Sequence, residues 1–159
     1  TMRRTDRELT GISELRAILD QCDAMRIAGQ DAEGFFIFPV NFGYTVEGDK
    51  LTLYFHSATE GRKARAFAQG CEIAFEMDCG HKLRTADTAC GHSFTYRSVM
   101  GTGQVVPLAS PEEKRTGLMA VMAHATGRDD WDFPDASLQK TAVYRLCVRT
   151  WSAKANLGG

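Results

Sequence analysis

The stretch LYFHSATEGRKARAF, residues 53–67, decides the fold class, because an alternating strand pattern runs directly into a helical one there. Side chains of a strand alternate between its two faces, which places Leu51, Leu53 and Phe55 on one face and Thr52, Tyr54 and His56 on the other. Ser57, three residues before Glu60, has the spacing of a capping box, and Thr59 is an equally good N-cap. Either N-cap predicts a helix that begins before Gly61.

Two basic residues, Arg62 and Lys63, fall in the first turn of that helix. The helix dipole and the free backbone N–H groups there disfavour cations and favour a bound anion. Together with the backbone around Gly61, the pair predicts a phosphate cradle, although the sequence has no Walker motif. An exposed basic helix face fits the same two residues equally well.

Length and composition predict one globular domain over residues 1–159, since 43% of the residues are hydrophobic and 25% are charged. The net charge of -1 gives no bulk attraction to nucleic acid or to an anionic membrane. The sequence contains no apolar run of membrane-spanning length, and its first ten residues are too charged for a signal peptide. Five cysteines without a CxxC pair predict free thiols. We therefore expect a cytoplasmic protein.

The remaining patterns predict a mainly β protein with flanking helices. Helices are expected at residues 10–22 and from Ser110 onward, and strands at 25–28, 35–46, 51–56, 71–78, 94–106 and 142–151. Gly48 and Asp49 form the tip of a hairpin turn, and Pro39 indicates a strand edge or bulge. Residues 79–93 read as a long polar loop. Alternation in the last strand places Trp151 opposite its core residues.

Several familiar chemical motifs are absent or have the wrong spacing. The segment CGH occurs at residues 79–81 and again at 90–92, but one intervening residue is too short for the usual spacing of zinc ligands. Neither a GxSxG elbow nor a GxGxxG loop is present. The sequence therefore predicts no metal site, no serine hydrolase and no Rossmann cofactor site.

Five blocks of sequence carry a resemblance to a known family: PVNFGY at 39–44, LYFHSATEGRK at 53–63, AFEMD at 74–78, AC at 89–90 with YRSVMGTG at 96–103, and WSAK at 151–154. In this order they resemble the FMN-binding split-barrel proteins related to pyridoxamine 5'-phosphate oxidase, most closely the 5-nitroimidazole-resistance subfamily. The resemblance covers roughly residues 3–154. It implies a six-stranded antiparallel split β-barrel that forms a homodimer, with FMN in each of two clefts between the subunits.

The resemblance also implies a set of site residues, by position. The phosphate-binding segment falls on His56, Ser57, Gly61, Arg62 and Lys63, and the strand along the flavin edge on Phe38, Val40 and Asn41. The other subunit would contribute Ser98, Val99, Met100, Trp151 and Lys154. Relatives often carry a glycine before that lysine, whereas Ser152 and Ala153 precede it here.

The implied activity is that of an FMN-dependent oxidoreductase. A donor such as NAD(P)H would reduce the flavin, and the flavin would reduce a small planar acceptor such as a 5-nitroimidazole. His56 is then either the proton donor to the acceptor or only a ligand of the FMN phosphate. The alternatives are a non-catalytic protein that holds flavin, haem or a deazaflavin, and a pyridoxamine-phosphate-oxidase-like enzyme. The chain lacks the basic strand motif and C-terminal arginine signature of the latter.

Overall fold

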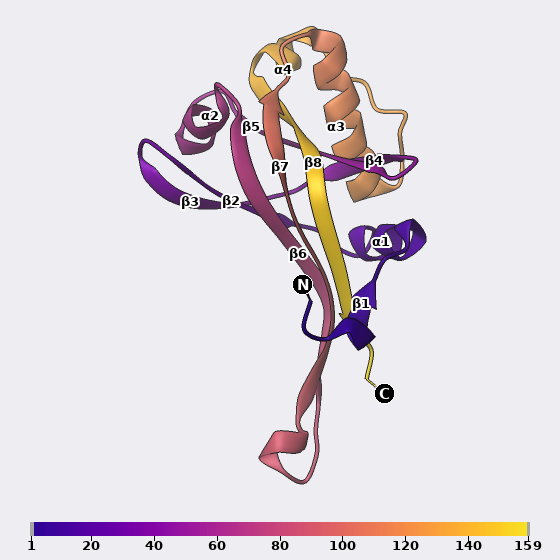
Figure 1. Cartoon of the computed structure of the whole chain (residues 1–159). Helices are drawn as coiled ribbons and strands as arrows, with labels where there is room; N and C mark the ends of the chain where they lie inside the picture. Colours follow the sequence, from indigo (N-terminus) through magenta and orange to yellow (C-terminus); the bar gives the residue numbers. More distant parts are fainter. Residues whose placement is uncertain (1, 159) are drawn as a thin grey trace.

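The computed structural model describes residues 2–158, and their eight strands form one antiparallel sheet. Along the sheet the strand order is β3-β2-β6-β7-β8-β5-β4, and the short β1 pairs with β8 (Figure 1). The two end strands, β3 and β4, do not pair with each other, so the barrel is split. The predicted mainly β, antiparallel split-barrel fold is confirmed, with eight strands rather than six.

The strands are β1 Glu8–Leu9, β2 Met25–Asp31, β3 Gly34–Val40, β4 Gly43–Glu47, β5 Lys50–Ala58, β6 Cys71–Arg84, β7 Ser93–Pro107 and β8 Thr141–Asn156. The helices are α1 Ile12–Leu19, α2 Arg62–Phe67, α3 Pro111–Thr126 and α4 Asp135–Gln139, with short 3-10 turns at Thr5–Arg7 and Ala89–Gly91. None of the helices in residues 2–158 has the length and apolar character needed to cross a bilayer.

The predicted N-cap is confirmed for α3, and the start of α1 is shifted by one residue. α3 begins as predicted, because the Ser110 hydroxyl accepts a hydrogen bond from the Glu113 amide at 3.2 Å. α1 begins after Gly11 rather than Thr10, since the Glu14 carboxylate accepts the Gly11 N–H at 3.1 Å. Both helices therefore owe their start to an acidic residue three positions on.

The predicted strand at residues 35–46 is in fact two strands at opposite ends of the sheet. β3 ends at Val40, the chain crosses over at Asn41 and Phe42, and β4 begins at Gly43. Pro39 pairs with Arg26 of β2 in an edge strand, which is where a residue without an N–H is tolerated. This division, with the two-residue β1, accounts for the two additional strands.

Aromatic rings close the gap that backbone pairing leaves open. The ring of Phe67 in α2 lies 5.7 and 5.9 Å from the rings of Phe36 and Phe38 in β3. On its other side it lies 5.5 Å from Phe55 of β5 and 5.4 Å from Tyr144 of β8. Edge-to-face and offset aromatic pairs of this kind stabilise beyond their buried area. α2 therefore joins β3 to β5 through side chains.

The predicted loop at residues 79–93 was wrong at residues 79–84 and 93, which belong to strands. β6 and β7 continue through it as a two-stranded ribbon, which we call the arm, residues 79–97, and only residues 85–92 connect the strands. The arm projects away from the body, past the chain's N- and C-terminal segments (Figure 1). Residues 80–94 are all exposed, so no buried face imposes the apolar alternation by which strands are recognised.

Both CGH segments lie on this arm. His81 Nε2 is 3.1 Å from Asp78 Oδ2, and His92 Nδ1 is 2.9 Å from the Thr88 carbonyl oxygen. Within residues 2–158 no group of three or more His, Cys, Asp or Glu side chains is arranged to hold a metal ion.

A β-bulge reverses the facing of the last strand. Opposite Thr102 and Gly103 of β7 lie Thr150 and Val148 of β8, so Arg149 is an extra residue. Beyond the bulge the side-chain alternation is shifted by one residue, and Trp151 packs against the main core. The prediction that Trp151 lies opposite the core residues of its strand was therefore wrong.

Candidate functional site

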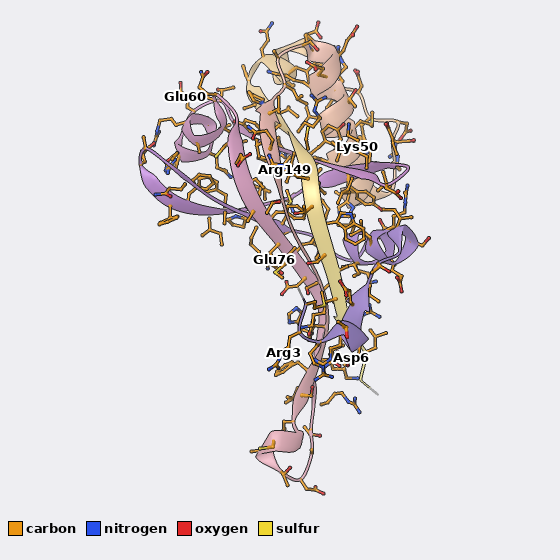
Figure 2. All side chains as sticks on the ribbon, in the orientation of Figure 1. Arg3, Asp6, Lys50, Glu60, Glu76 and Arg149 are labelled. Atoms are coloured by element: carbon orange, nitrogen blue, oxygen red, sulfur yellow. The ribbon has the colours of Figure 1, made fainter. Side chains whose placement is uncertain are left out.

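The first group of candidate residues lies where β5 ends and α2 begins. Ser57 still belongs to β5, and its hydroxyl donates to the Ala58 carbonyl at 2.7 Å, so neither it nor Thr59 is the N-cap of α2. The N-cap is Gly61, one residue after Glu60 (Figure 2). Its φ of 106° suits glycine, and no atom lies within 4 Å of where a Cβ would stand. The backbone here is open to an approaching group.

Two carboxylates on the β2–β3 turn hold the arginines of α2. Arg62 Nη2 is 2.7 Å from Asp31 Oδ1, and its Nη1 bonds Asp31 Oδ2. Arg65 forms a second forked pair with Glu33, at 2.9 and 3.2 Å. These hydrogen bonds, with Arg62 and Arg65 as donors, hold the pKa of Asp31 and of Glu33 below their ordinary values. We call these four residues the clamp, because they tie the β2–β3 turn to α2.

Nothing in the sequence pointed to the clamp. The acids at 31 and 33 are two residues apart in a turn, and the arginines at 62 and 65 are three apart on a helix. Only the fold makes them neighbours. As a result Arg62, which the sequence assigned to a phosphate, is committed to Asp31 in this structure.

Lys63 is the cation of the cradle that remains available. It is half-buried in the first turn of α2, and no ion pair to it occurs among residues 2–158. The Lys63 charge contributes to lowering the pKa of His56. His56 is the one exposed residue in the stretch from Leu51 to Ser57 of β5. Lys63, His56 and the open backbone at Gly61 therefore form one corner of the surface.

Partial burial of the imidazole and, after it, the Lys63 charge lower the pKa of His56 below its ordinary 6.5. His56 is therefore mostly neutral at pH 7 in the cofactor-free protein. Because its pKa is lower in the folded than in the unfolded chain, the free energy of unfolding is higher above pH 6.5 and decreases as the pH falls through the lowered pKa.

We expect an NMR titration to give a His56 pKa below 6.5, and Lys63→Ala to raise this pKa. An unchanged pKa in Lys63→Ala contradicts this placement of the lysine.

The strand predicted to meet the flavin edge is β3, at the end of the sheet. Phe38 is half-buried, with its ring stacked on Phe36 at 4.7 Å, and Val40 is buried in the core. Asn41 is exposed, and its amide donates to the Asp23 carbonyl at 2.9 Å. Within residues 2–158, β3 pairs only with β2. Its outer edge therefore presents backbone N–H and C=O groups without a strand partner, near Pro39.

The second group of candidate residues gathers on β7 and β8. Ser98 lies opposite Lys154, Val99 opposite Ala153, and Met100 opposite Ser152. Met100 is 55% exposed, whereas the Val99 side chain is fully buried. The Lys154 ammonium lies 5.9 Å from the Tyr96 ring centroid.

The two groups do not meet within one chain. β6 starts just after α2 at Cys71 and reaches the level of Ser98 only at Asp78. Seven residues of strand correspond to roughly 23 Å. Of the second group, Ser98, Met100 and Lys154 share the surface-facing side of the strands, whereas Val99 and Trp151 face the core.

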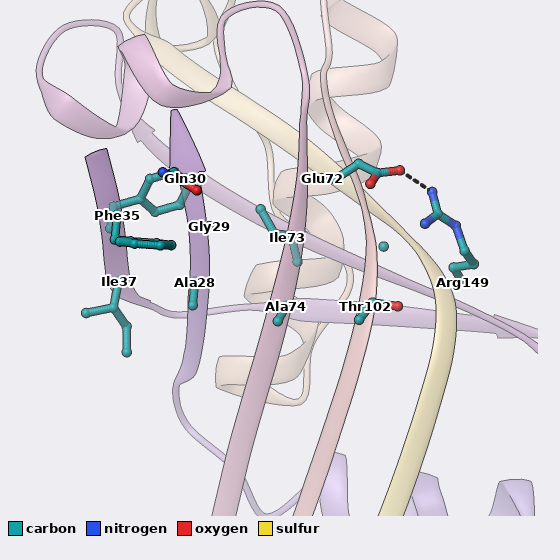
Figure 3. Close-up of a pocket in the computed structure, with 12 residues that line it drawn as sticks. Ala28, Gly29, Gln30, Phe35, Ile37, Glu72, Ile73, Ala74, Thr102 and Arg149 are labelled. Carbon is teal, nitrogen blue, oxygen red and sulfur yellow. Dashed lines mark hydrogen bonds and ion pairs between the residues drawn. The ribbon is translucent and has the colours of Figure 1, made fainter. Parts of the chain in front are cut away.

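A feature that sequence analysis missed is an apolar groove of about 730 Å³ on the outer face of the sheet. Phe35 and Ile37 of β3 border it with exposed fractions of 85% and 66%. Figure 3 shows Ala28, Ala74 and Thr102 along its floor, with the 2.6 Å ion pair between Glu72 and Arg149 on the far side. The signal was the run FFIF at 35–38, because four successive apolar residues in a strand indicate burial on both faces.

Comparison with known proteins adds the family. Residues 12–155 match the sequence model of a family described as pyridoxamine 5'-phosphate oxidase. No curated protein matched the chain.

Solved structures match over nearly the whole chain. A candidate 5-nitroimidazole antibiotic resistance protein from Bacteroides thetaiotaomicron is 29% identical with a TM-score of 0.78, over 93% of this chain and 86% of that one. An FAD and haem binding protein from Mycobacterium smegmatis is 24% identical with a TM-score of 0.80, over 96% and 74% of the two chains. The flavocytochrome Anf3 from Azotobacter vinelandii is 21% identical with a TM-score of 0.79, over 99% and 73%.

Proposed function

Because the chain belongs to the pyridoxamine 5'-phosphate oxidase family, we propose that it is an FMN-dependent oxidoreductase that reduces a small planar acceptor such as a 5-nitroimidazole. The observation that carries the proposal is the corner formed by Lys63, His56 and Gly61, beside the free edge of β3. A cation without a carboxylate partner, next to open backbone, fits a phosphate group. The named acceptor comes from the Bacteroides protein that this chain is similar to.

The residues of this corner have separate tasks toward the phosphate. Lys63 supplies the charge, neutral His56 can donate one ring N–H, and Gly61 lets the backbone approach closely. Ser57 is buried and lies 3.2 Å from the Tyr144 hydroxyl, which fixes this end of β5 beneath the site. Arg62 adds a second cation only by exchanging Asp31 for the phosphate.

The free edge of β3 is proposed to meet the ring system. Backbone groups of Phe38, Val40 and Asn41 can pair with the imide of a flavin ring, which presents both donors and acceptors. When bound, the flavin ring supplies the electron transfer. The chain then has to orient the ring, exclude water and hold a proton at His56.

We propose that the cofactor site is completed by a second copy of the chain. Ser98, Met100 and Lys154 are the members of the second group on the outer face of the sheet, together with the apolar groove. Exposed apolar surface of this kind marks an interaction site. A homodimer would bring Ser98, Met100 and Lys154 of one subunit to the β3 edge of the other.

A second candidate function is a flavin or haem carrier without turnover. The names of the Mycobacterium and Azotobacter proteins favour it, since one binds FAD and haem and the other is a flavocytochrome. Visible spectra separate the cofactors, because haem has an intense Soret band and flavin does not.

The test of the proposed function is a pair of half-reactions on the purified protein. We expect a flavin spectrum, bleaching by NAD(P)H and rapid reoxidation by a 5-nitroimidazole in stopped-flow traces. His56→Ala should keep the flavin and its reduction but slow reoxidation if the imidazole supplies a proton to the acceptor. Loss of flavin in His56→Ala would instead make His56 only a ligand of the phosphate. A flavin that is neither reduced by NAD(P)H nor reoxidised by the nitroimidazole supports the carrier function instead.

A further inference from the structure

The outer face of the sheet has an apolar pair of side chains at one end and the groove at the other. On the arm, Leu83 lies directly opposite Phe94, with exposed fractions of 49% and 54%. Phe94 has the same parity along β7 as Met100 and Thr102, and a bulge in β6 between Cys79 and Lys82 keeps Leu83 opposite it, so the pair continues the row of β7 side chains that leads to the groove. The arm therefore carries an apolar projection on the face that also bears an apolar hollow.

The arm has little of its own to stabilise it. An isolated two-stranded ribbon is marginal in water, and residues 80–94 are all exposed. At its base Asn156 donates to the Phe94 carbonyl at 2.6 Å, and Thr95 donates to Gly80 at 2.8 Å. A ribbon that exposes a leucine and a phenylalanine at matched positions needs a surface to cover them.

The register places the projection and the hollow at equal distances from Ser98. Phe94 is four residues away along β7 in one direction, and Thr102, which lines the groove, is four residues away in the other. Each separation is about 13 Å. A two-fold axis between two outer faces, perpendicular to the strands at the level of Ser98, therefore places Phe94 of each copy over Thr102 of the other.

The charges around that level are self-complementary. Arg26 lies 2.9 Å from Asp78 and 3.4 Å from Glu76, and both carboxylates are about one-third exposed. Arg26 is itself 42% exposed. In two copies related by the axis, Arg26 of each would lie two residues along the strands from the other's Asp78 and four residues from its Glu76, so Asp78 is the candidate cross-subunit partner in this isologous contact.

We propose that the arm of each subunit seats Leu83 and Phe94 in the outer-face groove of a second copy of the chain. This inference rests on the proposed homodimer and specifies its interface. Pro39 is level with Met100 across β2 and β6. With the axis at the level of Ser98, the partner's Ser98 lies about 7 Å along the strand direction from the level of Pro39, on the β3 edge where the flavin ring is proposed to bind, and the partner's Met100 lies about 13 Å from that level.

Chemical cross-linking tests the placement directly. In a Cys90→Ser background, which removes the exposed thiol, Phe94→Cys with Thr102→Cys should give a covalent dimer with a short bismaleimide. Within one chain the two positions are eight residues apart on one strand, about 26 Å, so a short linker cannot join them. Each single variant is the control and should give only background dimer. A double variant that behaves like the single ones overturns the placement.

A second measurement weakens the contact. Leu83→Asp with Phe94→Asp should raise the dimer dissociation constant by roughly 100-fold or more, since two large apolar side chains lose burial in each of two symmetric contacts. Thr85→Asp with Thr88→Asp adds the same charges on the arm's turn and should leave the constant within threefold.

Flavin absorbance is recorded in parallel with the cross-linking. A flavin-loaded dimer without the cross-link overturns the seating and leaves the proposed function standing. A cross-linked protein that binds no flavin supports the seating and overturns the proposed function.

Discussion

Lys63→Ala is expected to weaken FMN binding by roughly 10- to 150-fold, the equivalent of one charge-assisted hydrogen bond of about 1.5 to 3 kcal/mol. The physical reason is that Lys63 is the cation of the cradle without an ion pair among residues 2–158. Its loss removes a contact that the phosphate alone provides and leaves no carboxylate unpaired. Quenching of flavin fluorescence on titration of the cofactor-free protein measures the dissociation constant.

The matched control is Arg65→Ala, which removes one positive charge from the same helix. Arg65 is 59% exposed on its side chain and already bonded to Glu33, so its loss should change FMN affinity little. Raising the salt concentration should reduce the effect of Lys63→Ala. Equal losses in both variants contradict the assignment of the phosphate to Lys63 and indicate a general effect of charge.

Gly43→Ala is expected to lower the free energy of unfolding by about 3 kcal/mol, and the Tm by about 6 to 12 °C. A methyl group at Gly43 would stand 2.1 Å from the backbone carbonyl carbon of Ala120 and 2.3 Å from the Val121 nitrogen. The contact is with backbone of α3, which cannot rotate away as a side chain can. α3 would have to move off β4. Calorimetry on the purified protein measures the change.

Gly11→Ala is the control for glycine replacement itself. A methyl group there meets only the end of the flexible Glu14 side chain, at 2.9 Å, and the φ of -81° is ordinary for alanine. Its Tm should stay within about 2 °C of the parent. If both variants lose the same stability, the close approach of α3 to β4 is not the cause.

The fold was predictable from sequence wherever one face of an element is buried. The first half of β6 alternates because Ile73, Phe75 and Met77 must face the core. The arm was missed for the opposite reason, since residues 80–94 are exposed on both faces of the ribbon. The bulge at Arg149 was missed because it depends on which residues of β7 lie opposite β8. The family resemblance is confirmed, since it rested on whole blocks of sequence.

The candidate site was predictable only as a list of residues. His56, Gly61 and Lys63 are close in sequence, so their neighbourhood follows from one strand-to-helix turn. The commitment of Arg62 to Asp31 depends on two segments thirty-one residues apart, and no local pattern encodes it. The predicted facing of Trp151 was wrong because the bulge shifts the side-chain alternation of β8 by one residue. Ser98, Met100 and Lys154 stay predicted contributors from a second subunit.

The free edge of β3 has a consequence for the protein before it acquires cofactor and partner. An uncovered edge strand with exposed Phe35 and Ile37 is a template on which another chain can add a strand and begin to aggregate. Pro39 removes one of the N–H donors that such a growing sheet would need. Pro39, inside the β3 ladder, thus protects the newly made chain at its outer edge, and replacing it should make the chain more prone to aggregate.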